Sequence, residues 1–324
     1  MSLAAVETAE CPCPPFARLA PLVMRNVSMK VRSDWRSRSG QGLEGETVRL
    51  RMVGNPAGPR VLVLGGISAG RCVTSLDDGW WSGLAGPGRV IDTDRFLVIG
   101  ADYPPSGRCE AKDLCPEDFA RLIREALDEA GVQHLEAVVG SSFGGMVGLA
   151  FARLYPETVS TLVVLCAGHR PHPMATALRH VQRQILDLTE GTNREADGVA
   201  LARQLAMTTY RTAEEFGARF ADQGELRSYL HHHGTKYAGG VTAARYRTLS
   251  LAIDNHREDP RTIRVPTLVI AAESDRVVPL SIVQEMAAGL PKLLGYEVLR
   301  SAFGHDAFLK ETATIAPLLR RVLG

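Results

Sequence analysis

The stretch Val138-Val139-Gly140-Ser141-Ser142-Phe143-Gly144-Gly145-Met146 decides how the rest of the chain is interpreted. It predicts the end of a buried strand, a tight turn that carries a serine, and the start of a helix. The segment Gly140 to Gly144 fits the pattern G-x-S-x-G, in which a sharp turn presents a nucleophilic serine, here Ser142, above a sheet. Glycines give such a strained turn the space that it needs, and the helix N-terminus favours the negative charge that forms beside the serine. Five residues alone fit an ordinary strand-to-helix turn about as well.

The composition is that of an ordinary globular protein. The chain has 324 residues, of which 45% are hydrophobic and 23% are charged, enough for one domain or a domain with an insertion. Thirty-seven Lys and Arg balance 36 Asp and Glu, and the formal net charge is +1. Such a balance provides no global field to attract nucleic acid or an anionic membrane. No apolar run approaches the roughly 20 residues that span a bilayer, so we expect neither as a partner.

The cysteines indicate a reducing compartment. No secretory signal precedes them and their spacing is not that of metal ligands, so we expect reduced thiols in a cytoplasmic protein. The pair Cys11-Pro12-Cys13 also fits a redox or metal element, but its place in a proline-rich segment favours an incidental role. The six cysteines are Cys11, Cys13, Cys72, Cys109, Cys115 and Cys166.

The chain divides into three parts. Residues 1–21 are rich in proline, lack periodicity and predict a flexible leader. Residues 22–168 and 261–324 alternate short apolar strands with amphipathic helices, which predicts an α/β fold: a mostly parallel sheet covered by helices on both faces. Residues 169–260 contain helical patterns only and predict an inserted helical lid over the carboxyl edge of the sheet, where ligands bind in such folds.

The element boundaries follow from apolar periodicity and turn residues. Two alternating segments near the start predict antiparallel strands at one edge of the sheet. The expected strands are 23–32, 46–53, 60–64, 96–100, 136–139, 161–166, 267–271 and 296–299. The expected helices are 116–130, 145–154, 174–188, 197–207, 213–220, 243–253, 280–290 and 308–323.

A glycine-rich loop follows the strand 60–64. In this architecture, that loop donates one backbone N–H to an oxyanion hole, and the residue after the nucleophile donates the other. We therefore expect Phe143 and either Gly66 or Ile67 to form the hole. The same glycines also suit a plain tight turn, whereas a phosphate-binding loop is disfavoured because the Lys-Ser/Thr ending is missing.

Ser142, Asp275 and His305 form the candidate catalytic triad. Each follows a predicted strand, and their chain order, Ser, Asp, His, is the order of α/β-hydrolases. His305 would accept the serine proton, and Asp275 would fix the tautomer of the imidazole and stabilise its cation. Taken singly, Asp275 also fits a helix cap and His305 a loop histidine. Asp254 and Asp259 are competing acids, but neither follows a strand.

The run His231-His232-His233 raises the question of a metal. No carboxylate or cysteine stands at ligand spacing, so we interpret it as a solvated helix face and expect no metal site.

The chain resembles the homoserine O-acyltransferase family of the α/β-hydrolase superfamily, whose members transfer an acyl group from acyl-coenzyme A to homoserine. The segment 304–309, Gly-His-Asp-Ala-Phe-Leu, is close to a signature of that family. The other matching segments are 79–81, 86–88, 91–96, 140–146, 172–173 with Arg179, Gln182 and Arg183, 202–204, 209–210, and 228–230 with Gly234 and Lys236.

The resemblance implies a substrate site as well as a fold. It implies that Arg203 binds the homoserine carboxylate, that Tyr210 helps to hold the amino acid and that Asp306 receives its ammonium group. Arg203 and Tyr210 lie seven positions apart and would share one side of a helix, and a guanidinium can grip a carboxylate through two hydrogen bonds. Without the resemblance, a surface Arg–Glu pair for Arg203, a core tyrosine for Tyr210 and a helix N-cap for Asp306 would be the favoured interpretations.

The resemblance also implies a reaction, co-substrates and an assembly. The expected reaction is ping-pong acyl transfer to L-homoserine in methionine biosynthesis, with an acyl-serine intermediate and with acetyl-CoA or succinyl-CoA as co-substrate and no bound cofactor. A homodimer is also expected. An esterase or thioesterase with the same triad, a serine O-acyltransferase and a non-catalytic ligand-binding protein are the alternatives. The intact triad argues against the last of these.

Some positions depart from the family pattern. Phe143 replaces the usual methionine after the nucleophile, and the loop 65–69 resembles a shorter branch to which both acetyl and succinyl donors have been assigned. A succinyl donor carries a second carboxylate that needs a cation. Arg71, Arg108 and Arg276 are candidates for it by loop position, although each also fits a surface arginine, so the donor stays open.

Overall fold

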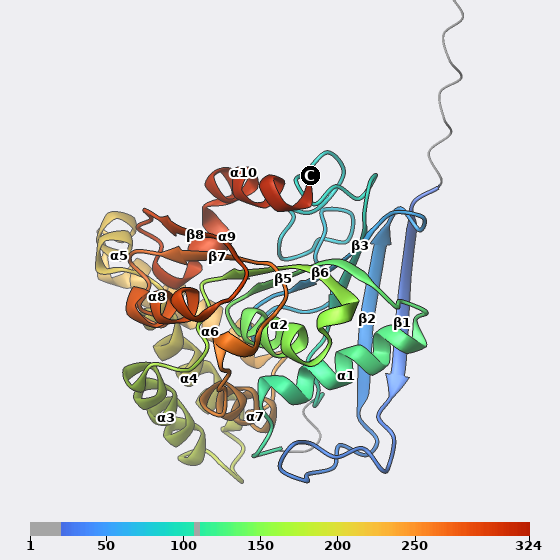
Figure 1. Cartoon of the computed structure of the whole chain (residues 1–324). Helices are drawn as coiled ribbons and strands as arrows, with labels where there is room; N and C mark the ends of the chain where they lie inside the picture. The colour runs from blue at the N-terminus through green and yellow to red at the C-terminus, as the bar shows by residue number, and fades with distance from the viewer. Residues whose placement is uncertain (1–20, 107–110) are drawn as a thin grey trace, which may run out of the picture.

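Short apolar runs assemble into one central sheet, which organises the whole molecule (Figure 1). The computed structural model describes residues 21–106 and 111–324. Residues 1–20 of the expected leader, with Cys11 and Cys13, lie outside these ranges, as do Arg108 and Cys109.

The sheet has eight strands in the order β1-β2-β4-β3-β5-β6-β7-β8. β1 pairs antiparallel with β2, and β2 antiparallel with β4, while every other neighbouring pair is parallel. The expectation of a mostly parallel sheet with an antiparallel edge is thus confirmed. The strands are β1 (Val23–Lys30), β2 (Thr47–Gly54), β3 (Arg60–Leu64), β4 (Leu97–Ala101), β5 (Leu135–Ser141), β6 (Val159–Leu165), β7 (Thr267–Ala272) and β8 (Leu293–Leu299).

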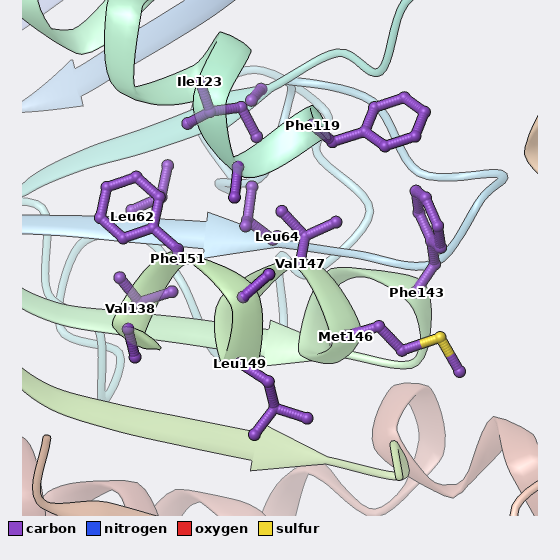
Figure 2. Close-up of a cluster of buried hydrophobic side chains, with 14 of the residues drawn as sticks. Leu62, Leu64, Phe119, Ile123, Val138, Phe143, Met146, Val147, Leu149 and Phe151 are labelled. Atoms are coloured by element: carbon purple, nitrogen blue, oxygen red, sulfur yellow. The ribbon is translucent and has the colours of Figure 1, made fainter. Parts of the chain in front are cut away.

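Helices cover one face of the sheet, and a mixture of helix and irregular chain covers the other. α1 (Pro116–Glu129), α2 (Phe143–Leu154) and α8 (Leu280–Gly289) contribute apolar side chains to the first core. Figure 2 shows part of this core, in which side chains of α1 and α2 pack against β3 and β5. The second core combines the opposite face of the strands with α10 (Thr312–Leu323) and with Trp81, Leu84 and Ile91 from the connection after β3.

The lid is built from helices that pack mainly on one another. They lie together on the left of the view in Figure 1 and share a small apolar core that includes Leu186, Val199 and Tyr246. The lid helices are α3 (Pro173–Asp187), α4 (Glu195–Tyr210), α5 (Ala213–Arg219), α6 (Gln223–Ala238) and α7 (Ala243–Asp254). α6 is missing from the helices expected from periodicity, because its polar residues are not segregated to one face. Within residues 21–106 and 111–324, no helix is both long and apolar enough to cross a bilayer.

The expected single closing helix over 308–323 is wrong. The chain forms two helices there, α9 (Ala307–Lys310) and α10, with a break at Glu311, where φ is −86° and ψ is 41°. In one continuous helix the carbonyl of Phe308 would accept the N–H of Thr312. The indole Nε1 of Trp81 takes that carbonyl instead at 2.9 Å, so a long-range contact replaces a helical hydrogen bond.

The turn at Ser142 is a tight, strained part of the fold. Ser142 has a φ of 53° and is one of three non-glycine residues with positive φ among the described residues. The turn presses against the end of β3, and a Cβ added at Gly144 would lie 2.2 Å from the carbonyl oxygen of Leu64. Glycine is therefore required at position 144 by the approach of two backbones.

We expect Gly144→Ala to lower the free energy of unfolding by about 1–3 kcal/mol or more, since β3 must move to admit the methyl group. Gly217→Ala on α5 is the matched control, because a Cβ there meets nothing within 4 Å. Chemical denaturation of the two variants checks this. Equal stability of both variants would contradict the close packing of the turn against β3.

Candidate active site

Three loops at one edge of the sheet bring Ser142, His305 and Asp275 into a hydrogen-bonded row. Ser142 Oγ lies 2.8 Å from His305 Nε2, and His305 Nδ1 lies 2.7 Å from Asp275 Oδ2. A carboxylate only accepts hydrogen bonds, so Nδ1 carries the proton and the neutral ring accepts from the serine through Nε2. His305 and Asp275 are buried, while Ser142 is partly exposed. The row has the geometry of a serine nucleophile with its base and orienting acid.

Asp275 is held in place by the turn that follows it. Its Oδ1 accepts hydrogen bonds from the N–H groups of Val277 at 2.8 Å and Val278 at 2.9 Å. One carboxylate oxygen thus binds the backbone of the loop before α8, and the other, Oδ2, accepts the hydrogen bond of His305. The helix cap considered for Asp275 from the sequence is not formed, because α8 begins at Leu280 and has no side-chain cap.

Burial and charge act on His305 in opposite directions. Burial disfavours the imidazolium, but the charge and hydrogen bond of Asp275, with a smaller contribution from Asp306, outweigh it and raise the pKa of His305 above its ordinary value. A base with a raised pKa binds the serine proton more strongly. The arrangement therefore favours proton transfer from Ser142.

The expected oxyanion-hole residues surround the serine. Phe143 is the first residue of α2, so its N–H has no acceptor within the helix. The loop after β3 brings Gly66 next to Ser142, where a Cβ at Gly66 would lie 3.7 Å from Ser142 Oγ. Gly66, Ile67 and Phe143 all line the same cavity as Ser142.

Tyr103 contacts both the loop after β3 and the first residue of α2. Its hydroxyl donates to the carbonyl oxygen of Gly65 at 2.9 Å, and its ring meets the ring of Phe143 edge to face, with centroids 4.9 Å apart. Gly65 also accepts the N–H of Gly144 at 3.0 Å. The loop after β3 and the turn at Ser142 are thereby fixed to each other.

A cavity of about 490 Å³ separates the sheet edge from the lid. The loops after β3, β5, β7 and β8 form its floor, and α3, α4 and α7 form its roof. Of the expected catalytic, oxyanion-hole and acceptor-binding residues, only Asp275 does not line it. The remaining lining is largely apolar, with Met146, Met174 and Leu178 among the contributors.

Arg203 enters the cavity from α4 and is surrounded by aromatic rings. Its guanidinium carbon lies 5.5 Å from the ring centroid of Tyr210 and 4.8 Å from that of Tyr237. Its Nη1 donates to Ser68 Oγ at 3.1 Å. Within the described ranges no carboxylate forms an ion pair with Arg203. This cation is therefore free to meet an anionic ligand.

Tyr210 and Asp306 adjoin the catalytic row. The ring of Tyr210 lies 5.8 Å from the ring of His305, centroid to centroid. Asp306 makes no side-chain cap of α9, the alternative considered for it from the sequence. Instead its Oδ2 accepts a hydrogen bond of 2.6 Å from Arg211 Nε.

The arginines that might meet a second carboxylate on the donor have different surroundings. Arg71 is paired with Asp102, whereas Arg276 lines the cavity and has no ion pair within the described part of the chain. Arg179, from α3, also lines the cavity and is paired with Asp254 at 2.6 Å. Of these cations, Arg276 is the one left without a carboxylate.

The histidine run lies on α6. His231 and His232 are exposed and His233 is partly exposed, with the ring of His233 against Tyr229 at 4.5 Å. In residues 21–106 and 111–324 no group of three or more His, Cys, Asp or Glu side chains is placed to hold a metal ion.

Several residues that contact the site were not predicted from the sequence. Ser68, Tyr237 and Arg211 touch expected site residues from loops and helices that only tertiary structure brings together. The one available signal was adjacency, because Ser68 follows Ile67 and Arg211 follows Tyr210.

Several known proteins are similar to this chain in sequence. A model of the alpha/beta hydrolase fold matches residues 59–312. Homoserine O-succinyltransferase of Xanthomonas campestris pv. campestris is 38% identical over 289 residues, which cover 85% of this chain and 78% of that protein. Homoserine O-acetyltransferase of Thermus thermophilus is 36% identical over 276 residues, covering 75% and 71%.

Solved structures agree on the fold. Esterase E22 matches with a TM-score of 0.80 at 19% identity, over 94% of this chain and 100% of that one. A homoserine O-acetyltransferase from Bacillus anthracis also matches with a TM-score of 0.80, at 18% identity, over 94% and 98%. Together with the sequence relatives, these matches show that the chain has the α/β-hydrolase fold and belongs to the homoserine O-acyltransferase family.

Proposed function

We propose that this protein is an acyltransferase that moves an acyl group from acyl-coenzyme A to the hydroxyl of L-homoserine. The observation that carries the proposal is the cavity, where the Ser142–His305 pair meets an arginine without a carboxylate partner and the aspartate Asp306. Homoserine has a carboxylate, an ammonium group and a hydroxyl, and the cavity offers a complementary group for each. The likeness to homoserine O-acyltransferases supports the same acceptor.

The first half-reaction acylates the enzyme. Ser142 Oγ attacks the thioester carbon while His305 Nε2 takes its proton, and the N–H groups of Phe143 and of the Gly66–Ile67 loop stabilise the oxyanion. The thioester bond then breaks, and the coenzyme A thiolate takes the proton from His305. Asp275 holds the imidazole and stabilises its cation throughout.

The second half-reaction transfers the acyl group. Arg203 binds the carboxylate of homoserine beside Tyr210, and Asp306 binds its ammonium group. The acceptor hydroxyl then lies at His305, which removes its proton as the oxygen attacks the acyl-serine carbon. Ser142 is released with that proton, and the ester product leaves. Such a reaction would serve methionine biosynthesis.

The donor is acetyl-CoA or succinyl-CoA. Relatives of similar identity bear each name, and Arg276 is a cation of the cavity that could meet a distal carboxylate. An esterase or thioesterase is the second candidate, because a triad of this geometry also serves hydrolysis. The two differ in whether water or the amino acid attacks the acyl-serine.

We expect coenzyme A release from acetyl-CoA or succinyl-CoA to depend on L-homoserine and to respond weakly to L-serine. Ser142→Ala should give no acyl-enzyme by mass spectrometry and should slow turnover by about 10⁴-fold or more. The measurement is thiol release with each donor, with and without each amino acid. Equal release in the absence of an acceptor would identify a hydrolase instead.

The acylation rate should depend on pH through His305. The base must be neutral, and its raised pKa places the midpoint of the acid limb of kcat/KM above the ordinary pKa of histidine, so activity falls as the pH drops through that midpoint. Asp275→Asn removes the main cause of the raised pKa and should shift the limb to lower pH while slowing acylation about 10⁴-fold. Stopped-flow acylation across pH tests both statements, and an unshifted limb in Asp275→Asn would refute the assignment.

Arg203→Ala should lower kcat/KM for homoserine by about 10²- to 10³-fold, the usual effect of removing one partner of a buried charge pair. Acylation by the donor should change little. Arg203→Lys should restore only part, because the flat guanidinium grips a carboxylate through two bonds. Arg194→Ala, on the exposed start of the same lid helix, is the control. An equal loss in both half-reactions would remove Arg203 from the acceptor site.

A further inference from the structure

One short segment of the lid is hydrogen-bonded to the loop that carries His305, the proposed base. Tyr210 ends α4, residues 211–212 lead to α5, and together they face residues 302–306. Thr212, which is buried, donates from Oγ1 to the carbonyl oxygen of Ala302 at 2.5 Å. At Gly304, where φ is +59°, an added Cβ would lie 2.5 Å from the carbonyl oxygen of Tyr210. The two backbones therefore touch without an intervening side chain.

Arg211 links this seam, the contact between residues 210–212 and 302–306, to the cavity through Asp306. Its Nε donates to Asp306 Oδ2 at 2.6 Å, and its Nη1 donates to Glu215 Oε1 at 2.8 Å. All three side chains are largely buried, with exposed fractions of 11% for Arg211, 15% for Asp306 and 10% for Glu215. A planar guanidinium bonded in two directions holds a carboxylate at a fixed angle better than a lysine would. The orientation of Asp306 is therefore set from the lid.

The two carboxylate oxygens of Asp306 differ in their hydrogen bonding. Oδ2 is taken by Arg211, and no donor within the described ranges hydrogen-bonds Oδ1. Asp306 lines the cavity, whereas Arg211 is not one of the cavity residues described here. One oxygen thus anchors the side chain, and the other is available to a ligand.

We propose that Arg211 is a positioning residue, which fixes Asp306 through Oδ2 and leaves Oδ1 for the ammonium group of the amino-acid acceptor. This inference rests on the proposed function, since it assumes an acceptor with an ammonium group. Because Tyr210 belongs to the same contact, the placement of Tyr210 and that of Asp306 are linked. Arg211 acts through Asp306 and does not touch the reacting atoms.

The same contact controls the charge next to His305. The charged and titratable groups that face the imidazole are Asp275 from the loop after β7, Asp306 beside it, Arg179 from α3 and Tyr210 from α4. Asp306 raises the pKa of His305 and Arg179 lowers it. Removal of the positive charge of Arg211 leaves the carboxylate of Asp306 uncompensated. The acid limb of acylation should then move to higher pH.

The test compares Arg211→Gln with Arg211→Lys and with Arg247→Gln. Arg247 is the matched control, because it also lies in the lid, holds two carboxylates, Asp187 and Glu190, and has a side chain only 9% exposed. Arg211→Gln should lower kcat/KM for homoserine about 10- to 100-fold. The acylation rate on its high-pH plateau should stay within about threefold of wild type. The pH at which this rate falls to half of the plateau should be higher than in wild type. Arg211→Lys should return the limb to its wild-type position, and Arg247→Gln should change neither property.

A double-mutant cycle with Asp306→Asn separates positioning from folding. If Arg211 acts through Asp306, adding Arg211→Gln to Asp306→Asn should change homoserine use by less than about twofold. Effects that multiply, or an equal loss of both half-reactions with an unmoved acid limb in Arg211→Gln, would overturn the inference. Absence of homoserine-dependent release in the wild-type protein would instead overturn the proposed function, so the two failures are distinguishable.

Discussion

The structure depends on the backbone turn that holds Ser142 at positive φ against the end of β3. Gly140 and Gly144 let the turn close, and a side chain at either position would strike backbone atoms. The turn projects Ser142 from the sheet edge and starts α2 at Phe143, so the proposed nucleophile and one oxyanion donor have a common origin. The loops after β7 and β8 then need only reach the same edge to bring Asp275 and His305 into line. Rigid strands thus define where the chemistry takes place.

The lid brings charged side chains to the cavity above that frame. Arg179 is neutralised by Asp254, whereas Arg203 stands among aromatic rings without a carboxylate. Asp306 supplies negative charge near the histidine, and Arg211 holds one of its oxygens. This arrangement of charges is the basis for the proposal of a zwitterionic acceptor with a hydroxyl group. The proposed preference for transfer over hydrolysis therefore originates in the lid and not in the catalytic row.

The departures from the expected elements have long-range causes. The closing helix breaks at Glu311 because the indole of Trp81, from a distant loop, takes the carbonyl of Phe308. α6 forms although its apolar residues show little periodicity, and it packs closely on α4, where a Cβ added at Gly234 would lie 2.6 Å from the carbonyl oxygen of Ala200. In both places a tertiary contact outweighs the local pattern of residues.

The sequence by itself determined the α/β-hydrolase fold, with its succession of strands along the chain and the turn at Ser142. These features depend on local spacing, since apolar runs and glycines act over a few residues. Only the tertiary structure decided which groups face one another: Ser68 and Tyr237 around Arg203, Tyr103 behind Gly65, and Arg211 on Asp306. Each of these contacts joins separate elements, and its free energy depends on a distance that no sequence pattern contains.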